Sequence, residues 1–397
     1  MNVVHIELPA SISEDLAVEI AKQAAHASRA VRALRWDPAR RVAAVTIDDA
    51  ARSSLAEDKV RRLITALVAR HRPLPKRVLT TSVRRDRGPL VRDVEHRLAQ
   101  IGAVRPTGPG TVALSGPALA FAQKLDALVA AAARDRFGAR ADAYPALLPA
   151  DVLHRCGYLT SFPHAATMAT HLTEDLDAIE RFRADNRASR AFAPPDPAAL
   201  AAPVAFLAPA VCYHLYPSLE GLSIDSPLLV VTAEGRCFRY ESIHMRGLLR
   251  LWDFSMREII CAGPEPAVAA ARDRLLDLAL EIARDLDLDL RVETASDPFF
   301  SSEYAQKTYW QTRNDLKLEL LLDIPPADDD RPRTAAASSF NLHEDHFGRT
   351  FGFTAGGSPA FTGCAAWGLS RWVLAAFAQH GLDPHRWPES WRSDVFS

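Results

Sequence analysis

The chain has 397 residues, of which 48% are hydrophobic and 24% charged, a balance typical of a globular protein with room for two or three domains. No apolar run approaches the length that crosses a bilayer, so we expect a cytoplasmic protein without a membrane partner. The cysteines form no CxxC pair and are widely spread, which argues against a disulfide framework and leaves reduced thiols or metal ligands. They lie at positions 156, 212, 237, 261 and 364.

Positive charge is concentrated near the start of the chain. Residues 1–105 contain 20 Lys and Arg against 12 Asp and Glu, a local charge of +8 within a chain of net charge −2. The remaining residues therefore carry −10. A basic module on an acidic body suggests either an acidic partner for that module or an ordinary solvated surface.

The first 85 residues alternate between strand and helix patterns in the order βαββαβ, which predicts a small ferredoxin-like α/β domain over residues 1–85. Its strands are expected at residues 3–8, 32–36, 41–47 and 77–81. Residues 86–113 are expected to form a linker region, because Gly88-Pro89 and Gly108-Pro109-Gly110 interrupt any regular pattern.

Residues 114–397 form the larger predicted domain. Ser115 and Pro117 open a long helix, a second helix is expected over 265–286, and residues 183–203 have the composition of an exposed connection. Because few crossover helices separate the expected strands, the sheet should be largely antiparallel and the fold class α+β. These strands are expected at residues 228–232, 236–241, 254–261, 290–294 and 316–324.

The segment CFRYESIHMRGLLRLWDFSMRE, residues 237–258, has the order of chemical types that nucleotide activation needs. An alternating strand places Arg239 and Glu241 on one surface, where the arginine can hold a phosphate and the carboxylate can accept from an amine. The loop that follows is basic, and Phe254 offers a flat apolar face for a purine. The segment predicts an ATP site, and an ordinary hairpin with a basic turn remains the alternative.

A second arginine near the C-terminus could complete such a site. In CAAWGLSRWVLAAF, residues 364–377, Gly368 precedes Arg371 at the start of a helical pattern, so a strand entering a helix could direct the guanidinium onto a nucleotide. No glycine-rich phosphate loop is present in the sequence. A surface arginine on a buried helix is the alternative.

Taken together, the long helix that opens at Ser115 and the segments 237–258 and 364–377 resemble the class II aminoacyl-tRNA synthetase core. From about residue 104 to 388 the chain is similar to the amino acid:carrier protein ligases, stand-alone relatives of the catalytic core of methanogen-type seryl-tRNA synthetases. The strings that carry this resemblance run in order: CGYLTSFP (156–163), CYHLYP (212–217), CFRYE (237–241), FSMREIICAG (254–263), SDPFF (296–300), SSFNLHEDHFG (338–348) and TGCAAWGLSR (362–371). The resemblance implies an antiparallel sheet flanked by helices.

The resemblance further implies a zinc ion that grips the amino group of the substrate. Its ligands fall on Cys212, Glu258 and Cys364, separated by 46 and 106 residues, and two thiolates with one carboxylate leave a fourth position open. The other three cysteines are expected to be buried thiols. We expect His343 and His346 to make hydrogen bonds and not to bind metal.

The nucleotide roles also follow from the resemblance. Arg239 would bind the α-phosphate and carboxylate, Glu241 would fix the adenine amino group, and Phe254 would stack on adenine. Arg371 would cover the other face of the base and reach the γ-phosphate, and Arg250 would contact phosphate. Glu319 matches a strand carboxylate of the seryl enzymes. Mg²⁺ is expected with ATP, although the apolar residues 335–337 replace a glutamate that the synthetases carry there.

The implied reaction forms an aminoacyl adenylate and transfers the acyl group to the phosphopantetheine thiol of a carrier protein. A small amino acid, glycine or alanine, is favoured, and a homodimer is expected. Two alternatives stay open: aminoacylation of tRNA, and a catalytically silent paralogue that binds or regulates. The basic module could dock an acidic carrier protein through Arg84, Arg85 and Arg87 or belong to the dimer architecture.

Overall fold

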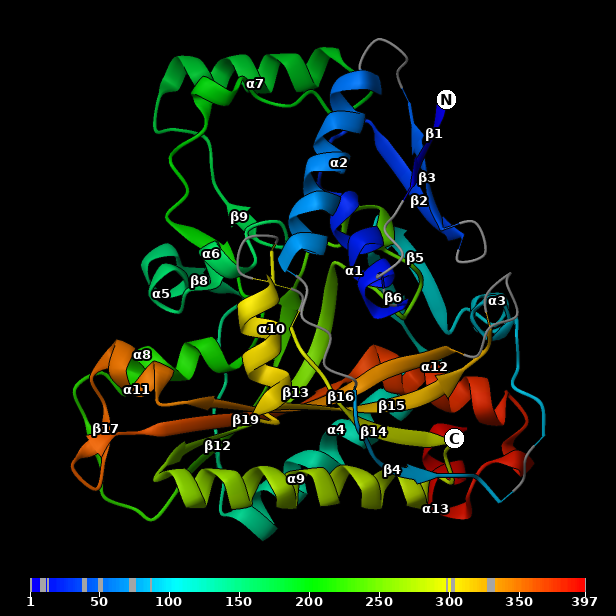
Figure 1. Cartoon of the computed structure of the whole chain (residues 1–397), viewed down its shortest axis with the longest axis vertical. Helices are drawn as coiled ribbons and strands as arrows, with labels where there is room; N and C mark the ends of the chain where they lie inside the picture. Colours follow the sequence, from blue (N-terminus) through cyan, green and yellow to red (C-terminus); the bar gives the residue numbers. More distant parts are fainter. Residues whose placement is uncertain are drawn as a thin grey trace.

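Two sheets dominate the molecule, a three-stranded sheet near the N-terminus and an eight-stranded sheet in the larger domain (Figure 1). They are seen in a computed structural model. It describes residues 2–7, 12, 14–37, 41–48, 53–70, 76–85, 88–297, 299–300, 304–326 and 333–396.

The N-terminal module comprises the described part of residues 2–70. Its antiparallel sheet has the order β1 (Asn2–Glu7), β3 (Val42–Ile47), β2 (Val31–Asp37). Two helices, α1 (Glu14–Ala24) and α2 (Ser53–Arg70), pack together and against it. The apolar positions of strands and helices share one core, which includes Ile6, Leu16, Ile20, Val45, Val60 and Leu67. Burial of each such large side chain stabilises the fold by roughly 2 kcal/mol.

The fourth strand of the expected ferredoxin-like domain lies elsewhere. β4 (Val78–Ser82) pairs antiparallel with β14 (Leu290–Thr294) and forms one edge of the eight-stranded sheet. Three basic residues along this segment pair with carboxylates of the larger domain: Lys76 with Glu293, Arg77 with Asp315, and Arg84 with Asp289. The expectation of four strands in one small domain ending at residue 85 was therefore wrong, because the long-range pairing of β4 outweighs its place in the local βαββαβ order.

The eight-stranded sheet has the order β4-β14-β15-β16-β19-β13-β12-β7. All neighbours are antiparallel except β12 and β7, so the predicted antiparallel sheet is confirmed. Its remaining strands are β7 (Arg140–Ala141), β12 (Leu229–Phe238), β13 (Asp253–Gly263), β15 (Lys317–Ile324), β16 (Arg333–Glu344) and β19 (Phe361–Gly368). Two strands predicted at 228–232 and 236–241 are one continuous strand, β12.

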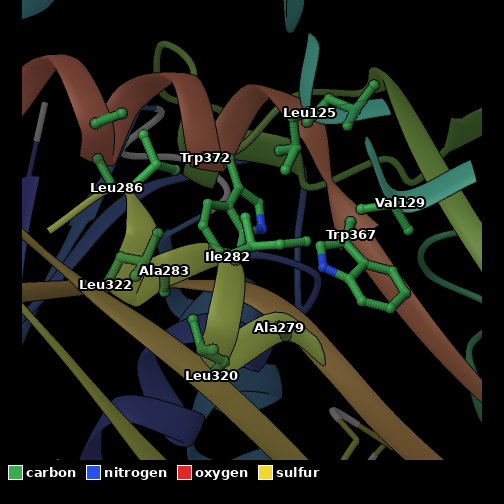
Figure 2. Close-up of a cluster of buried hydrophobic side chains, with 14 of the residues drawn as sticks. Leu125, Val129, Ala279, Ile282, Ala283, Leu286, Leu320, Leu322, Trp367 and Trp372 are labelled. Carbon is green, nitrogen blue, oxygen red and sulfur yellow. The ribbon is translucent and has the colours of Figure 1, made fainter. Parts of the chain in front are cut away.

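Helices cover one face of this sheet and bury the main core. They are α4 (Gly116–Phe137), α9 (Glu265–Asp285), α12 (Leu369–His380) and α13 (Glu389–Val395). Figure 2 shows Trp367 of β19 and Trp372 of α12 among apolar side chains of α4, α9 and β15. In Figure 1, α9 runs along the lower side of the sheet, and the N-terminal module stands beyond the other side. That other side carries two smaller apolar clusters, and polar side chains lie among them.

Residues 88–114 are folded against the larger domain and do not form a linker. They contain α3 (Val94–Gln100) and the hairpin of β5 (Val104–Gly108) and β6 (Thr111–Leu114), and α3 contributes Val94 and Leu98 to the main core. At the hairpin tip, Gly110 has a φ of +65°, and a Cβ there would lie 2.8 Å from that of Trp252. Gly108 and Gly110, which predicted a linker, instead belong to a tight turn that packs against Met245 and Trp252.

A small outlying sheet, β8-β10-β9, carries a helix that projects from the body. This helix, α7 (Leu176–Ala188), buries none of its residues, in line with the exposed connection expected there. Among the described residues, no helix is long and apolar enough to cross a membrane. The shorter elements are β8 (Leu147–Pro149), α5 (Ala150–Arg155), α6 (Tyr158–Ser161), β9 (Thr167–Ala169), η2 (Pro197–Ala199), β10 (Ala205–Leu207), η3 (Cys212–His214), α8 (Leu215–Ser218), β11 (Ser223–Ile224), η4 (Ser242–His244), α10 (Tyr304–Arg313), α11 (His346–Phe351), β17 (Thr354–Ala355), β18 (Ser358–Pro359) and η5 (Pro384–Arg386).

Candidate active site

Cys212, Glu258 and Cys364 lie together on the face of the sheet opposite the helices, and we call them the Cys–Glu–Cys cluster. Their ligand atoms all lie within 4.8 Å of one another. Glu258 and Cys364 come from the neighbouring strands β13 and β19, whereas Cys212 begins η3. All three are buried, with relative exposures of 5%, 1% and 6%. Residues separated by 46 and 106 positions in the sequence are thus brought to one point by strand pairing.

The cluster concentrates acidic groups away from water. The backbone N–H groups of Val211 and Cys212 donate to the two oxygens of Glu258, at 3.0 and 3.1 Å. Burial raises the pKa of Glu258 to about 7, and nearby Cys364 adds to the effect. Two sulfurs and a carboxylate at this separation are a donor set that suits Zn²⁺, and a bound cation would relieve the repulsion among them.

The two thiols differ in their tendency to ionise. A hydrogen bond from Cys212, with further contributions from His343 and Asn341, holds the pKa of Cys364 well below its usual range despite burial. The same bond, together with burial and the charge of Glu258, raises the pKa of Cys212 well above its usual range. Cys364 is therefore the more readily ionised sulfur, and metal binding would have to displace the proton of Cys212.

The two histidines near the cluster make hydrogen bonds, as expected. His343 Nδ1 lies 3.2 Å from Thr362 Oγ1, and its Nε2 lies 3.7 Å from Cys364 Sγ. His346 Nε2 lies 3.4 Å from the carbonyl oxygen of Cys156. Neither belongs to the group of candidate metal ligands found among the described residues. His343 instead lies beside Cys364, a candidate ligand, and can orient it.

Three arginines converge next to the cluster, and with Glu241 and Phe254 we call them the arginine pocket. Arg239 Nε donates to the carbonyl oxygen of Pro209 at 2.9 Å, and its guanidinium lies 5.5 Å above the ring of Phe254. Arg250 Nη1 donates to Glu241 at 2.5 Å. The Arg239–Glu241 stretch extends past the end of β12 at Phe238, so strand alternation does not place these side chains as predicted. Loop contacts hold them instead.

Arg371 lies in the first turn of α12, three residues after Gly368, as the sequence predicted. Its Nε donates to Leu249 O and its Nη1 to Ala336 O, both at 2.9 Å. The first acceptor belongs to the basic loop, residues 242–251, and the second to the apolar stretch of β16. Arg371 thereby ties the basic loop to the sheet.

The pocket has an excess of positive charge. Burial, and after it the charge of Arg250, lowers the pKa of Arg371 to about 10, although Glu241 opposes this. Burial acts to raise the pKa of Glu241, but Arg250, Arg371 and Arg239 outweigh it and the net shift is downward. Arginines that destabilise one another in this way are suited to a polyphosphate. Arg239 also interacts electrostatically with Glu258, so the pocket and the Cys–Glu–Cys cluster adjoin.

Two charged residues of the site were not singled out from the sequence. Lys317 Nζ lies 2.5 Å from Asp297 Oδ1 and 3.2 Å from Glu319 Oε1. Lys317 is opposite Asn341 in the sheet, and Asn341 is opposite Cys364, so the three share one row across the polar face. The spacing Lys-x-Glu in a strand could have indicated a shared face. The partner Asp297, which follows another strand, could not have been found that way.

No protein-family model matches the chain. Amino acid–[acyl-carrier-protein] ligase 2 of Bradyrhizobium diazoefficiens is 38% identical over 258 residues, which cover 62% of this chain and 71% of that protein. The type-2 serine–tRNA ligase of Methanococcus aeolicus is 29% identical over 255 residues, which cover 62% of this chain and 48% of that protein.

Among solved structures, SerRS of M. kandleri in complex with A. aeolicus tRNASec aligns with a TM-score of 0.69 and 21% identity, over 99% of this chain and 77% of that one. This similarity shows the fold: the chain has the α+β architecture of a class II synthetase core. With 38% identity over 71% of its Bradyrhizobium relative, the chain belongs to the family of amino acid–[acyl-carrier-protein] ligases.

Proposed function

We propose that this protein activates a small amino acid with ATP and transfers it to the phosphopantetheine thiol of a carrier protein. The observation that carries the proposal is that a buried Cys–Glu–Cys cluster adjoins the group formed by Arg239, Arg250 and Arg371. The first can hold an amine through a metal, and the second can hold a triphosphate. The names of the relatives supply the carrier protein as acceptor.

Zinc is the proposed metal, with Cys212, Glu258 and Cys364 as ligands. The ion would supply a Lewis-acidic fourth position for the amino group. The chain does the rest of the positioning: backbone donors at Val211 and Cys212 orient the carboxylate of Glu258, and His343 and Asn341 orient Cys364. Such supporting contacts usually affect metal affinity strongly.

The arginine pocket is proposed to bind ATP together with Mg²⁺. Arg239 would contact the α-phosphate and the amino acid carboxylate, and Arg250 and Arg371 the outer phosphates. Phe254 and Glu241 would hold the adenine. The carboxylate oxygen attacks the α-phosphorus and pyrophosphate leaves; the thiol sulfur then attacks the carbonyl carbon and AMP leaves. Catalysis of this kind depends on orientation and on stabilising phosphate charge.

Glycine or alanine is the proposed substrate. Support comes from the row that Lys317, Asn341 and Cys364 form across the sheet, because these polar side chains occupy space close to the proposed amine site. A homodimer is proposed on the resemblance to class II synthetases. Static light scattering on the purified protein would test it.

Amino-acid-dependent ATP–pyrophosphate exchange with the standard amino acids and small analogues tests the activation step. We expect exchange with glycine or alanine. Transfer is then followed with radiolabelled amino acid to three acceptors: carrier protein with its phosphopantetheine arm, the same carrier without it, and bulk tRNA. Label should appear only on the first and be released by hydroxylamine, as a thioester is. Label on tRNA would favour the aminoacylation alternative, and no exchange with any amino acid would favour the silent paralogue.

A further inference from the structure

The N-terminal module is fixed to the larger domain through aromatic side chains next to the proposed substrate site. Phe299 is buried in the core of the module, and Phe162 packs against that core. The Phe162 and Phe299 rings stack at 5.2 Å, and Gln23 Nε2 of α1 donates to Phe299 O at 3.0 Å. Phe299 comes two residues after Asp297, the partner of Lys317. The module therefore holds a loop whose other end reaches the polar face of the sheet.

A second loop joins α6 to β9 and, with the end residues Ser161 and Thr167, spans residues 161–167. It lies between the module and the hairpin that carries the arginine pocket. The N–H of Tyr240 donates to Ala165 O at 3.1 Å, and Trp252 Nε1 donates to Thr167 Oγ1 at 2.8 Å. These contacts join the loop to both sides of the hairpin, just before and just after the basic loop. Any displacement of residues 161–167 would therefore be passed to Glu241 and Arg250.

His164, in the middle of this second loop, meets the module through His26. The two rings form an edge contact at 4.7 Å, and His164 also stacks on Phe300 at 5.2 Å. His164 Nδ1 is buried and makes no hydrogen bond within the described part of the chain. Ring contacts, and not a hydrogen bond at this nitrogen, thus hold the side chain of His164.

The electrostatics agree with a close approach of the module to the pocket. Burial, then His164 and His244, lowers the pKa of His26 to about 4, while Glu241 has the opposite effect. Burial likewise lowers the pKa of His164. The imidazoles are therefore uncharged at neutral pH and can pack together beside a cationic pocket without adding to its charge.

We propose that His26 of the N-terminal module is a positioning residue for nucleotide binding, acting through His164 on the hairpin that carries Glu241 and Arg250. The inference builds on the proposed ATP-dependent activation and adds that the N-terminal module is part of the activating machinery. A module that only bound a macromolecular partner would not need this contact.

The experiment uses the full chain with His26→Ala, His164→Ala and the double variant, and His26→Phe to restore a ring. His5→Ala is the matched control, because His5 is an exposed histidine on β1 of the same module. For each protein we would measure the KM for ATP, the KM for the amino acid and kcat in pyrophosphate exchange. Calorimetric binding of a non-hydrolysable ATP analogue and the melting temperature complete the set.

We expect His26→Ala to raise the KM for ATP and the Kd of the analogue about five-fold, as loss of one ring contact would, with kcat and the KM for the amino acid unchanged. His26→Phe should recover most of the loss. The effects of His26→Ala and His164→Ala should not add, because both break one connection.

Unchanged ATP binding in folded His26→Ala would overturn the inference, and so would additive effects in the double variant. Should His26→Ala fail to fold, His164→Ala carries the test alone, since it leaves the core of the module intact. Failure of the proposed function looks different: the wild-type protein would then show no exchange and no binding of the analogue.

Discussion

The Cys–Glu–Cys cluster and the arginine pocket adjoin each other, but the chain builds them differently. Two of the cluster's side chains stand on paired strands, β13 and β19, and the third is fixed by backbone hydrogen bonds to Glu258. The pocket's arginines lie past a strand end, on the basic loop or at a helix start. Arg239 and Arg371 bind carbonyl oxygens of segments distant in the sequence, and Arg250 binds the nearby Glu241. Strand pairing and backbone hydrogen bonds therefore hold the cluster rigidly, whereas the arginine pocket depends on side-chain contacts with loops.

Replacement of a cluster ligand should have the largest effect. We expect Cys364→Ser to lose zinc and to reduce amino-acid-dependent exchange by at least about a hundred-fold, because the metal site loses a soft ligand. Zinc content is measured by atomic emission and exchange by radiolabelled pyrophosphate. Cys261→Ser is the control, since Cys261 is buried on β13 but belongs to the core on the helix-covered face. Equal zinc in wild type and Cys364→Ser would contradict a cluster built for metal.

Loss of a support in the pocket should have a smaller effect that falls on ATP. For Arg371→Lys we expect kcat/KM for ATP to fall about thirty-fold, because lysine keeps the charge but cannot hold both Leu249 O and Ala336 O while facing phosphate. Zinc content should not change. Arg349→Lys, an exposed arginine on α11 paired with Asp345, is the control. A variant that loses zinc as well would show that the two regions are not independent.

The smallest expected effect is on the melting temperature at acidic pH, and it depends on His26 in its contact with His164. The pKa of His26 is about 4 in the folded chain against an ordinary 6.5, so the unfolded chain takes up a proton first as the pH falls. The contribution of neutral His26 to the free energy of unfolding is therefore fully present above pH 6.5 and is lost as the pH falls toward 4. His26→Asn should show a smaller drop in melting temperature between pH 7 and pH 5, by a few degrees. An identical drop in both proteins would place the acid-sensitive groups elsewhere.

Local patterns predicted the elements of the larger domain well. The antiparallel sheet, the two long helices and the placement of Arg371 after Gly368 follow from apolar periodicity and from the order of residue types. The Cys–Glu–Cys cluster could be predicted only through the resemblance, because no spacing rule joins residues from η3, β13 and β19. The pair of Asp297 and Lys317 was missed for the same reason, because Asp297 follows β14 and Lys317 begins β15, and no local pattern joins the two residues.

Local patterns failed where the partner of a segment lies far away in the sequence. The basic run near residue 80 suggested a surface for an acidic partner, but Lys76, Arg77 and Arg84 meet acidic residues of the same chain. Arg84 is only 5% exposed and also donates to the carbonyl oxygens of Gln379 and Gly88. It therefore cannot serve as a docking residue. Arg87 lies outside the described residues.

The pairing of β4 with β14 has a consequence for how this protein can be divided. The segment that leaves the N-terminal module is itself the border strand of the large sheet. A shortened chain that starts after Arg85 would expose the hydrogen-bonding groups of β14. An exposed edge strand of this kind can pair with other chains and cause aggregation. An intact core for separate study must therefore begin before Lys76, so that the sheet keeps its own border.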